Sequence, residues 1–263
     1  MKERSLLLNI LNSTYHNFQL ASKGLQNTDN VPRLSPSGLT NHLGCQHLTR
    51  LEWEASRGER TAPPPTNRVL ELLQERGRRH EAAYAEHLAK AGFRVHTMEE
   101  RSVQATLEAM RDGHDFIFQA QLADPDESGS EIRWHGRADV LRKVSPDRPL
   151  PLPDRERHAQ ASGSDLSSRF GDYHYIVEDT KLARTTKGAT LLQLSVYSEL
   201  LARLQERTPE WMHVITPGTG FEPEPYRVDA FAAYYRLTKE SYERAIHEME
   251  QSPATYPYIV GKC

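Results

Sequence analysis

The sequence predicts an α/β fold in which a central mixed sheet is flanked by helices. Two observations lead to this prediction. Helix-like and strand-like hydrophobic periodicities alternate along the chain, and 263 residues are enough to bury one large core. The hydrophobic fraction of 37% is low for a compact globule, so we also expect some polar, poorly packed segments.

Two segments have this polar character. Residues 1–33 carry a short leucine cluster followed by a polar tract, which predicts a poorly ordered N-terminal extension. Residues 145–171 are rich in Pro, Ser, Asp and Arg, a composition that buries too little apolar surface to order itself. We interpret them as a long loop inserted between two core strands of a domain that spans residues 34–263.

The elements of this domain follow in order. Ser35 and Pro36 are typical of an N-cap followed by proline at the first helical position, and they open a helix that runs to about Arg57. A proline-rich linker separates it from a second helix at about 67–91. Strands are expected at about 115–122, 131–143, 173–181, 211–216 and 224–229, and further helices at 189–207 and 231–250.

Charge and composition limit the classes of partner. The net charge of −3 gives no general support to nucleic-acid binding, although local basic clusters occur. No stretch approaches the ~18 apolar residues of a membrane span, so no membrane partner is expected. Only two cysteines are present, too few for a disulfide framework, which favours a reducing cytoplasm.

The stretch "DYHYIVEDTKLAR" places charges at the end of an apolar strand. With a period of two, Asp179 and Lys181 project to one face and Glu178 to the other. An ordinary ion pair at a strand end explains such a motif as well as a functional site does. The functional interpretation needs a second acid.

The stretch "IRWHGRADVLRKV" offers this second acid. Asp139 is a lone acid among apolar and basic residues, and Gly136 before it indicates a bulge or a close backbone approach. If this strand pairs with the strand of Asp179 as an antiparallel hairpin across the 145–171 loop, the two carboxylates converge. Facing carboxylates repel unless a cation lies between them, so the pair predicts an oxygen-ligand site for Mg²⁺ or Mn²⁺.

A third ligand candidate lies on the second helix. His80 falls on an apolar stripe that includes Val69, Leu73 and Tyr84, so it faces the predicted core. A satisfied core histidine is the simpler explanation. Gly77, one turn earlier, favours a close approach to another element and hence the functional explanation.

Gln193 and Tyr197 form a polar pair on the helix after the second acidic strand. They are four residues apart and share one face of a leucine-rich helix. A half-exposed polar pair on an amphipathic helix is the alternative. Because they follow the acidic strand end, we expect both side chains to hydrogen-bond phosphate or sugar groups of DNA.

The order His80, "GRAD", "DTK" and "QLSVY" resembles the RecB-like branch of the PD-(D/E)XK nuclease superfamily. The stretches "LSPSGLTNHLGCQHLTRLE" and "EDTKLAR" are similar to RecB-family nucleases that are often fused to superfamily 1 helicase domains. The resemblance covers roughly residues 34–263, and the proline of the family name is absent before Asp139. It implies a restriction-endonuclease-like core and metal-dependent hydrolysis of DNA phosphodiester bonds, in repair or defence.

The resemblance also implies roles for single residues. His80, Asp139 and Asp179, with the backbone carbonyl of Thr180, would bind Mg²⁺ or Mn²⁺. Asp139, Asp179 and Lys181 would be the catalytic set, in which Lys181 positions the attacking water or stabilises charge on the phosphate. Gln193 and Tyr197 would hold the DNA, as a single strand or a duplex end, and a helicase domain or subunit would be a partner.

Two other functions stay open. One is a catalytically inactive DNA-binding or helicase-docking module that keeps the nuclease fold. The other is a structural ion-pair site in an unrelated α/β protein. The intact set of two acids and a lysine favours the nuclease, because a module without catalysis has no need for mutually repelling carboxylates.

Some relatives in the family carry a 4Fe–4S cluster held by one N-terminal and three C-terminal cysteines. Cys45 and Cys263 are the candidate ligands here. Two thiolates cannot complete a four-cysteine site, so a cluster is expected only if the natural chain is truncated here and continues beyond Cys263. Otherwise Cys45 is a small buried hydrophobe and Cys263 an incidental terminal residue.

Overall fold

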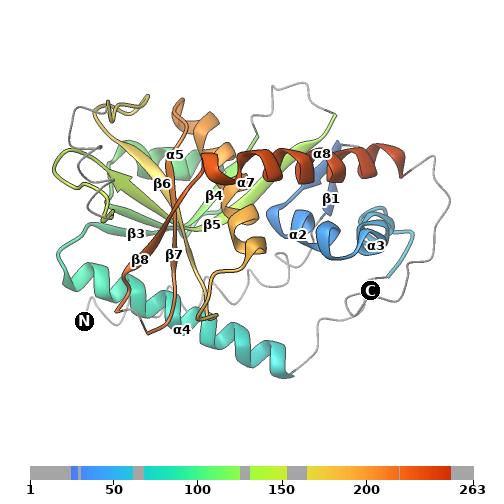
Figure 1. The fold of residues 1–263 in the computed structure, drawn as a ribbon, viewed down its shortest axis with the longest axis horizontal. Helices are drawn as coiled ribbons and strands as arrows, with labels where there is room; N and C mark the ends of the chain where they lie inside the picture. The colour runs from blue at the N-terminus through green and yellow to red at the C-terminus, as the bar shows by residue number, and fades with distance from the viewer. Residues whose placement is uncertain are drawn as a thin grey trace.

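A computed structural model of the chain describes residues 25–28, 31–61, 68–124, 131–152, 165–218 and 220–249. Its centre is a mixed, eight-stranded sheet with helices on both faces (Figure 1). This confirms the predicted α/β class and the flanked mixed sheet. Within the described residues, none of the helices has both the length and the apolar composition that a membrane-crossing segment needs.

The sheet is organised around β5, the longest strand. β5 pairs in parallel with β2 and antiparallel with both β4 and β6. β6 and β7 are parallel, β7 and β8 antiparallel, and β3 joins the edge of β4 in parallel. The strands are β1 (Leu25–Thr28), β2 (Val31–Leu34), β3 (Val95–Thr97), β4 (Phe116–Ala123), β5 (Arg133–Val144), β6 (His174–Thr180), β7 (Trp211–Ile215) and β8 (Pro223–Arg227).

The helices follow the predicted order, with two differences. The predicted helix at 35–57 is broken at Cys45, whose backbone is extended with φ of −163°. A short helix, α5, lies where no helix was predicted. The helices are α2 (Pro36–Gly44), α3 (Gln46–Ser56), α4 (Arg68–Lys90), α5 (Val103–Arg111), α7 (Gly188–Gln205) and α8 (Ala232–Glu248), with a 3₁₀ turn η2 (Asp229–Phe231) before α8.

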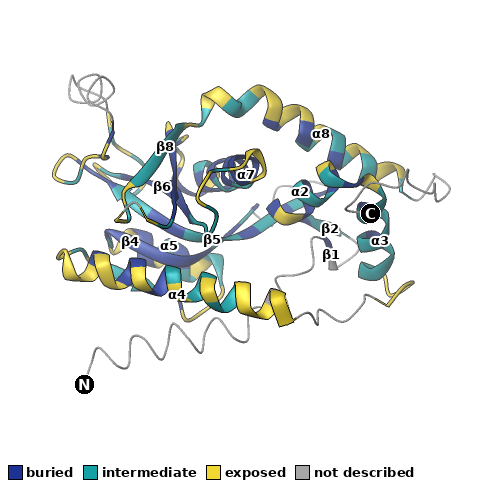
Figure 2. Ribbon diagram, turned by 60° about the horizontal axis from the view of Figure 1, so that its bottom comes forward, coloured by how far each residue is buried: buried dark blue, intermediate teal, exposed yellow. Residues whose placement is uncertain are grey.

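The two faces of the sheet carry separate cores (Figure 2). On one face, α7 packs its leucines against the alternate residues Tyr175 and Val177 of β6. On the other, Tyr84 of α4 packs against Phe116 and Phe118 of β4. α4 therefore covers one face, and α7 the other, which gives the residues of β6 two different environments.

The interpretation of α4 as a core-facing stripe along its whole length is wrong. Val69 is 61% and Leu73 49% exposed, because the first turns of α4 extend beyond the sheet (Figure 2). A Cβ atom at Gly77 would meet nothing within 4 Å, so this glycine permits no close approach. Among the described side chains, core contacts of α4 begin near Ala82 and Tyr84.

The two predicted polar segments are partly ordered. β1 and β2 lie within or next to residues 1–33, and Leu25 and Leu34 are buried, because the hairpin adds to the edge of the sheet beside β5. The 145–171 segment connects β5 to β6, as predicted, but Leu150 and Leu152 are buried against Ile176. Residues 1–24 and 153–164 lie outside the described part of the chain.

Candidate functional site

The ladder between β5 and β6 brings the two predicted acids together. The strands are antiparallel, as predicted, and their last pair joins Val140 to Glu178. One more step of this register sets Asp139 opposite Asp179, close enough for Asp139 to raise the pKa of Asp179. Asp139 Oδ2 also accepts hydrogen bonds from the backbone N and from Oγ1 of Thr180, at 3.1 and 3.2 Å.

Lys181 completes this cluster. Its Nζ lies 2.9 Å from Oδ1 and 2.7 Å from Oδ2 of Asp179. Burial lowers the pKa of Lys181, but the carboxylates of Asp179 and Asp139 outweigh it, so the net shift of its pKa is upward. Burial, and then the neighbouring Asp139, raise the pKa of Asp179 to about 8 in spite of Lys181. One ammonium group therefore does not offset the burial of Asp179 and the repulsion from Asp139.

Glu178 points to the opposite face, as the period of two predicts. Burial acts to raise its pKa, but Arg142 and His213 reverse this and hold the pKa of Glu178 at about 2. Tyr84 donates to its Oε2 at 2.7 Å, and Arg142 to its Oε1 at 3.2 Å. Glu178 is therefore a buried, fully partnered structural acid and contributes nothing to the cluster on the other face.

The acids open into a cavity of about 570 Å³ that Gln193 and Tyr197 of α7 also line. Tyr197 and Pro36 close over Gly136 of β5. A Cβ atom there would lie 2.7 Å from Tyr197 Cε1 and 3.0 Å from Pro36 Cδ, so only glycine fits. The prediction that Gly136 marks a close approach is confirmed, and the structure brings Asp139, Asp179, Lys181, Gln193 and Tyr197 into one cavity.

The structure does not place His80 among the residues that line this cavity. Its ring stacks on Phe221, with the centroids 5.5 Å apart, and Phe221 stacks in turn on Tyr84. His80 Nε2 is buried without a hydrogen-bond partner among the described residues. The sequence assigns His80 to the metal site, but its position here is a contact between α4 and the loop before β8.

Glu81, the next residue, lies close to the acid pair and was missed in the sequence. It is 9% exposed and accepts a hydrogen bond from Gln119 Nε2 at 2.5 Å. Burial, and then Asp139, raise the pKa of Glu81 to about 8. A signal was available: Glu81, Tyr84 and Leu88 follow the i, i+3, i+7 spacing of a core-facing stripe.

Gln119 itself has a strained backbone. Its φ of 61° is unusual for a residue other than glycine. It stands opposite Asp139 in the β4–β5 register, between the pairs Phe118–Val140 and Ala120–Ala138. The ladder is therefore interrupted at Asp139, which lets Glu81 from α4 approach this acid.

A divalent cation such as Mg²⁺ or Mn²⁺ needs several converging oxygen donors. In the described part of the chain, no three His, Cys, Asp or Glu side chains are gathered as a ready-made metal site. Asp139 and Asp179 are nevertheless two adjacent carboxylates whose repulsion a cation would relieve, and oxygen donors suit Mg²⁺ or Mn²⁺. The pair fits a hard divalent ion, and both acids also act to raise the pKa of Glu81.

Cys45 and Cys263 are the two candidate iron–sulfur ligands. Cys45 is buried at the N-cap of α3. Cys263 lies outside the described residues.

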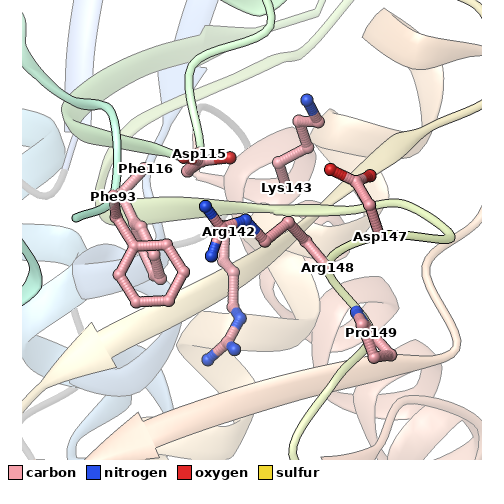
Figure 3. Close-up of a pocket in the computed structure, with 8 residues that line it drawn as sticks. All are labelled: Phe93, Asp115, Phe116, Arg142, Lys143, Asp147, Arg148 and Pro149. Carbon is pink, nitrogen blue, oxygen red and sulfur yellow. The ribbon is translucent and has the colours of Figure 1, made fainter. Parts of the chain in front are cut away.

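A second, smaller cavity of about 230 Å³ has different chemistry (Figure 3). Arg142 there is paired with Glu178 and lies over the ring of Phe116. Asp115 accepts from the backbone N of Arg94, and Asp147 from Ser145. Its charged groups have structural partners, so the larger cavity is the better candidate. The smaller one is lined by Phe93, Asp115, Phe116, Arg142, Lys143, Asp147, Arg148 and Pro149.

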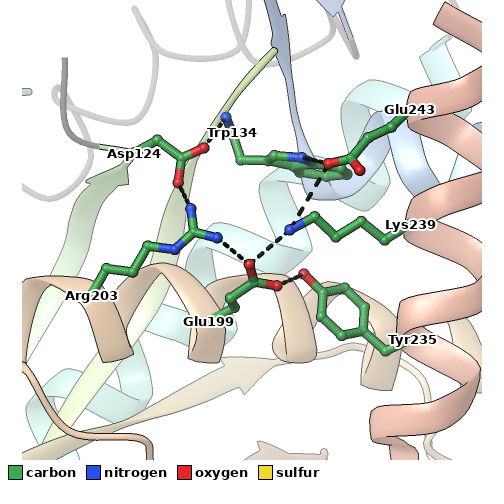
Figure 4. Close-up of polar contacts among 7 residues, drawn as sticks. All are labelled: Asp124, Trp134, Glu199, Arg203, Tyr235, Lys239 and Glu243. Carbon is green, nitrogen blue, oxygen red and sulfur yellow. Dashed lines mark hydrogen bonds and ion pairs between the residues drawn. The ribbon is translucent and has the colours of Figure 1, made fainter. Parts of the chain in front are cut away.

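A polar network fixes the helix that carries Gln193 and Tyr197 (Figure 4). On α7, Glu199 accepts from Lys239 of α8 at 2.7 Å, and Arg203 pairs with Asp124 at the end of β4. Trp134 of β5 donates to Glu243 of α8 at 2.7 Å. These contacts tie α7 and α8 to the strands on the same face as the cavity.

Comparisons with known proteins give no family for this chain. No family model matches it, and no curated protein matches. Among solved structures, the crystal structure of SSO0001 matches with a TM-score of 0.35 and 13% identity, over 95% of this chain and 86% of that chain. A likeness at this level carries no argument about function.

Proposed function

We propose that this protein is a metal-dependent nuclease that hydrolyses DNA phosphodiester bonds, with a RecB-like PD-(D/E)XK core. One observation carries the proposal: Asp139 and Asp179 converge beside Lys181 in a cavity that also contains Gln193 and Tyr197. An isolated structural ion pair needs one acid. Here a second carboxylate raises the pKa of the first, which makes the cluster unfavourable without a cation.

The two aspartates would hold Mg²⁺ or Mn²⁺, with the backbone carbonyl of Thr180 assisting. The bound metal would act as a Lewis acid toward a phosphoryl oxygen. We propose that Glu81 adds its charge to the negative field of the acid pair, since Asp139 and Asp179 both act to raise its pKa. Like His80, it is not among the residues that line the cavity.

Lys181 keeps its proton because its carboxylate neighbours raise its pKa above the ordinary value. An ammonium group at this point can orient an attacking water or stabilise negative charge that grows on the phosphate. Burial, and then Asp139, raise the pKa of Tyr197, so its phenol stays protonated as a hydrogen-bond donor. The amide of Gln193 adds a second donor for the DNA backbone.

The test is cleavage of end-labelled single-stranded and duplex DNA with Mg²⁺, Mn²⁺ or EDTA. We expect metal-dependent cleavage that falls by about 100-fold or more in Asp179→Asn and Lys181→Ala. Asp172→Asn, an exposed acid just before the same strand, is the matched control and should cleave as the wild type does.

Two outcomes would contradict the proposal. Cleavage that survives in both site variants would place the chemistry elsewhere. A folded wild type that binds DNA but cleaves none with either metal would support the inactive DNA-binding or helicase-docking module. A role in repair or defence, with a helicase partner, is part of the proposal and depends on the first result.

A further inference from the structure

The cavity has a basic arm beside its acidic cluster. Arg33 of β2, Arg101 before α5, and His135 and Arg137 of β5 line the same cavity as Asp139. His135 and Arg137 are alternate residues of β5, so they project to one face of it, and Asp139 follows them where the β4–β5 ladder is interrupted. The strand therefore leads from the acid pair directly into a row of basic side chains.

These basic groups lie close to one another. Burial lowers the pKa of Arg101, and the nearby Arg137 lowers it further. Burial likewise lowers the pKa of His135, with Arg33 as the second cause. Like charges held together in a partly buried cavity attract an anionic ligand.

Two polar atoms of the basic arm are left without partners. Arg33 Nε and His135 Nε2 are buried and have no hydrogen-bond partner within the described ranges of the chain. Buried polar atoms almost always have one. Both atoms therefore indicate a ligand that supplies hydrogen-bond acceptors, as a phosphate does.

Two helix N-termini open on the same cavity. Ser35 caps α2 and Ser102 caps α5, and both serines are part of the lining. Neither helix carries an acidic residue in its first turn, although Glu100 accepts a hydrogen bond from Ser102 Oγ at 2.7 Å just before α5. Helix N-termini add to the attraction for an anion that the arginines already provide.

We propose that Arg33, Arg101, His135 and Arg137 form a phosphate subsite that holds one backbone phosphate of the substrate strand next to the bond placed at Asp139 and Asp179. The identity of the strand as nucleic acid rests on the proposed function. The anionic character of the ligand follows independently from the basic arm. One end of the cavity then takes a cation and the other a phosphate.

The test is binding of a short fluorescent single-stranded DNA in EDTA, measured by anisotropy at several salt concentrations. Arg33→Ala and Arg101→Ala should each weaken binding about tenfold, the expected loss for a hydrogen bond to a charged group. Each should also flatten the dependence of log Kd on log salt, by at most about 0.7, the value for complete loss of one phosphate contact on a single strand. Arg111→Ala, at the exposed end of α5, removes the same charge outside the cavity and should change neither quantity.

Several outcomes would overturn the subsite. One is an unchanged DNA affinity in both cavity variants. Another is an equal loss of DNA affinity in Arg111→Ala. A third is weaker DNA binding by the cavity variants with an unchanged dependence on salt. Arg101 precedes α5 in a loop, so Arg101→Ala keeps the test decisive if Arg33→Ala unfolds, which thermal unfolding will show. Inorganic phosphate is the second probe, with chloride at equal ionic strength as its control. If phosphate displaces the labelled DNA where chloride does not, the result supports a phosphate site. If phosphate displaces no more DNA than chloride does, the result counts against the site.

The binding experiment in EDTA tests the phosphate subsite separately from the nuclease proposal. EDTA removes metal and cleavage, so binding is measured alone. Arginine-dependent binding by a wild type that does not cleave with Mn²⁺ would leave the subsite standing and end the nuclease proposal. Cleavage that is unaffected by Arg33→Ala and Arg101→Ala would end the subsite alone.

Discussion

Glu178 and Asp179 are neighbours in the chain and both are buried, yet their pKa values shift in opposite directions. The pKa of Asp179 is raised to about 8, and the pKa of Glu178 is lowered to about 2. Burial acts to raise both values, so the difference lies in the partners that each face of the sheet supplies. Arg142 and His213 stabilise the anion of Glu178, while Asp139 opposes that of Asp179.

Glu178→Gln should destabilise the fold. The change leaves Arg142 and His213 without their anion, and breaking a buried ion pair on one side costs about 3 kcal/mol in the free energy of unfolding at pH 7. The native pKa of Glu178 lies below its unfolded value. Its stabilisation is therefore complete above about pH 5 and is lost as the pH falls from the unfolded value toward about 2.

Urea unfolding between pH 7 and pH 3 measures this. The difference in the free energy of unfolding between wild type and Glu178→Gln should become smaller as the pH falls. A difference in the free energy of unfolding that does not depend on pH would contradict the negative charge assigned to Glu178. Glu86→Gln removes an acid from an exposed ion pair with Lys90 and should change stability by less than about 0.5 kcal/mol.

Two glycines should respond to alanine with opposite signs. At Gly136 the new Cβ would meet Tyr197 at 2.7 Å, so Gly136→Ala should lower Tm and displace Tyr197 from the cavity. At Gly77, inside α4, a Cβ meets nothing within 4 Å, and Gly77→Ala should stabilise by about 0.5–1 kcal/mol. Thermal unfolding of both variants checks this, and a destabilising Gly77→Ala would restore the close approach that the sequence suggested there.

At the scale of the element, α7 separates DNA contact from metal binding. Gln193→Ala and Tyr197→Ala should weaken DNA binding several-fold, because each removes a donor to the phosphate backbone. Metal affinity should stay unchanged, since neither side chain is a proposed ligand. Calorimetry with Mn²⁺ and anisotropy with DNA measure the two properties separately, and equal loss of metal binding would show that the roles are wrongly assigned.

The sequence predicts long, periodic elements well and short ones poorly. α4, β6 and α7 carry enough periodic residues to be located within a few positions. β1 and β3, with four and three residues, offer too few positions for a period of two to be visible. The break at Cys45 was also missed, because a capped helix start at Ser35 says nothing about where the helix ends.

The convergence of Asp139 and Asp179 could be predicted from strand alternation, whereas the surroundings of His80 on a helix could not. Asp139 and Asp179 follow from two strands and an antiparallel pairing. His80 and Glu81 differ by one position on a helix, which turns the side chain by about 100°. The predicted apolar stripe extended too far toward the N-terminus of α4, so the packing of His80 against Phe221 was not foreseen.

For the whole molecule, the acid pair predicts a trade between stability and function. Asp139→Asn removes a repelling charge but keeps an oxygen that can accept from Thr180. Without metal, the variant should unfold at a Tm a few degrees above that of the wild type. Mn²⁺ should raise the Tm of the wild type, because it binds the folded state, and leave the variant nearly unchanged.

Differential scanning fluorimetry with and without Mn²⁺ makes this comparison. An equal rise in Tm for both proteins would place the metal elsewhere. A variant less stable than the wild type in EDTA would show that Asp139 contributes more through its hydrogen bonds than it costs through repulsion.

The pairing of β2 with β5 has a consequence for how the protein acquires its activity. This pairing brings Arg33 and Ser35 to a cavity whose other walls are made much later in the chain, up to Tyr197. Contacts between residues so far apart in the sequence form slowly. The chain must lose the entropy of closing the long intervening loop before these contacts can stabilise it. During synthesis, a chain that has not yet left the ribosome as far as α7 has no complete cavity. Ligand binding should therefore be among the last properties to return on refolding, together with the full sheet.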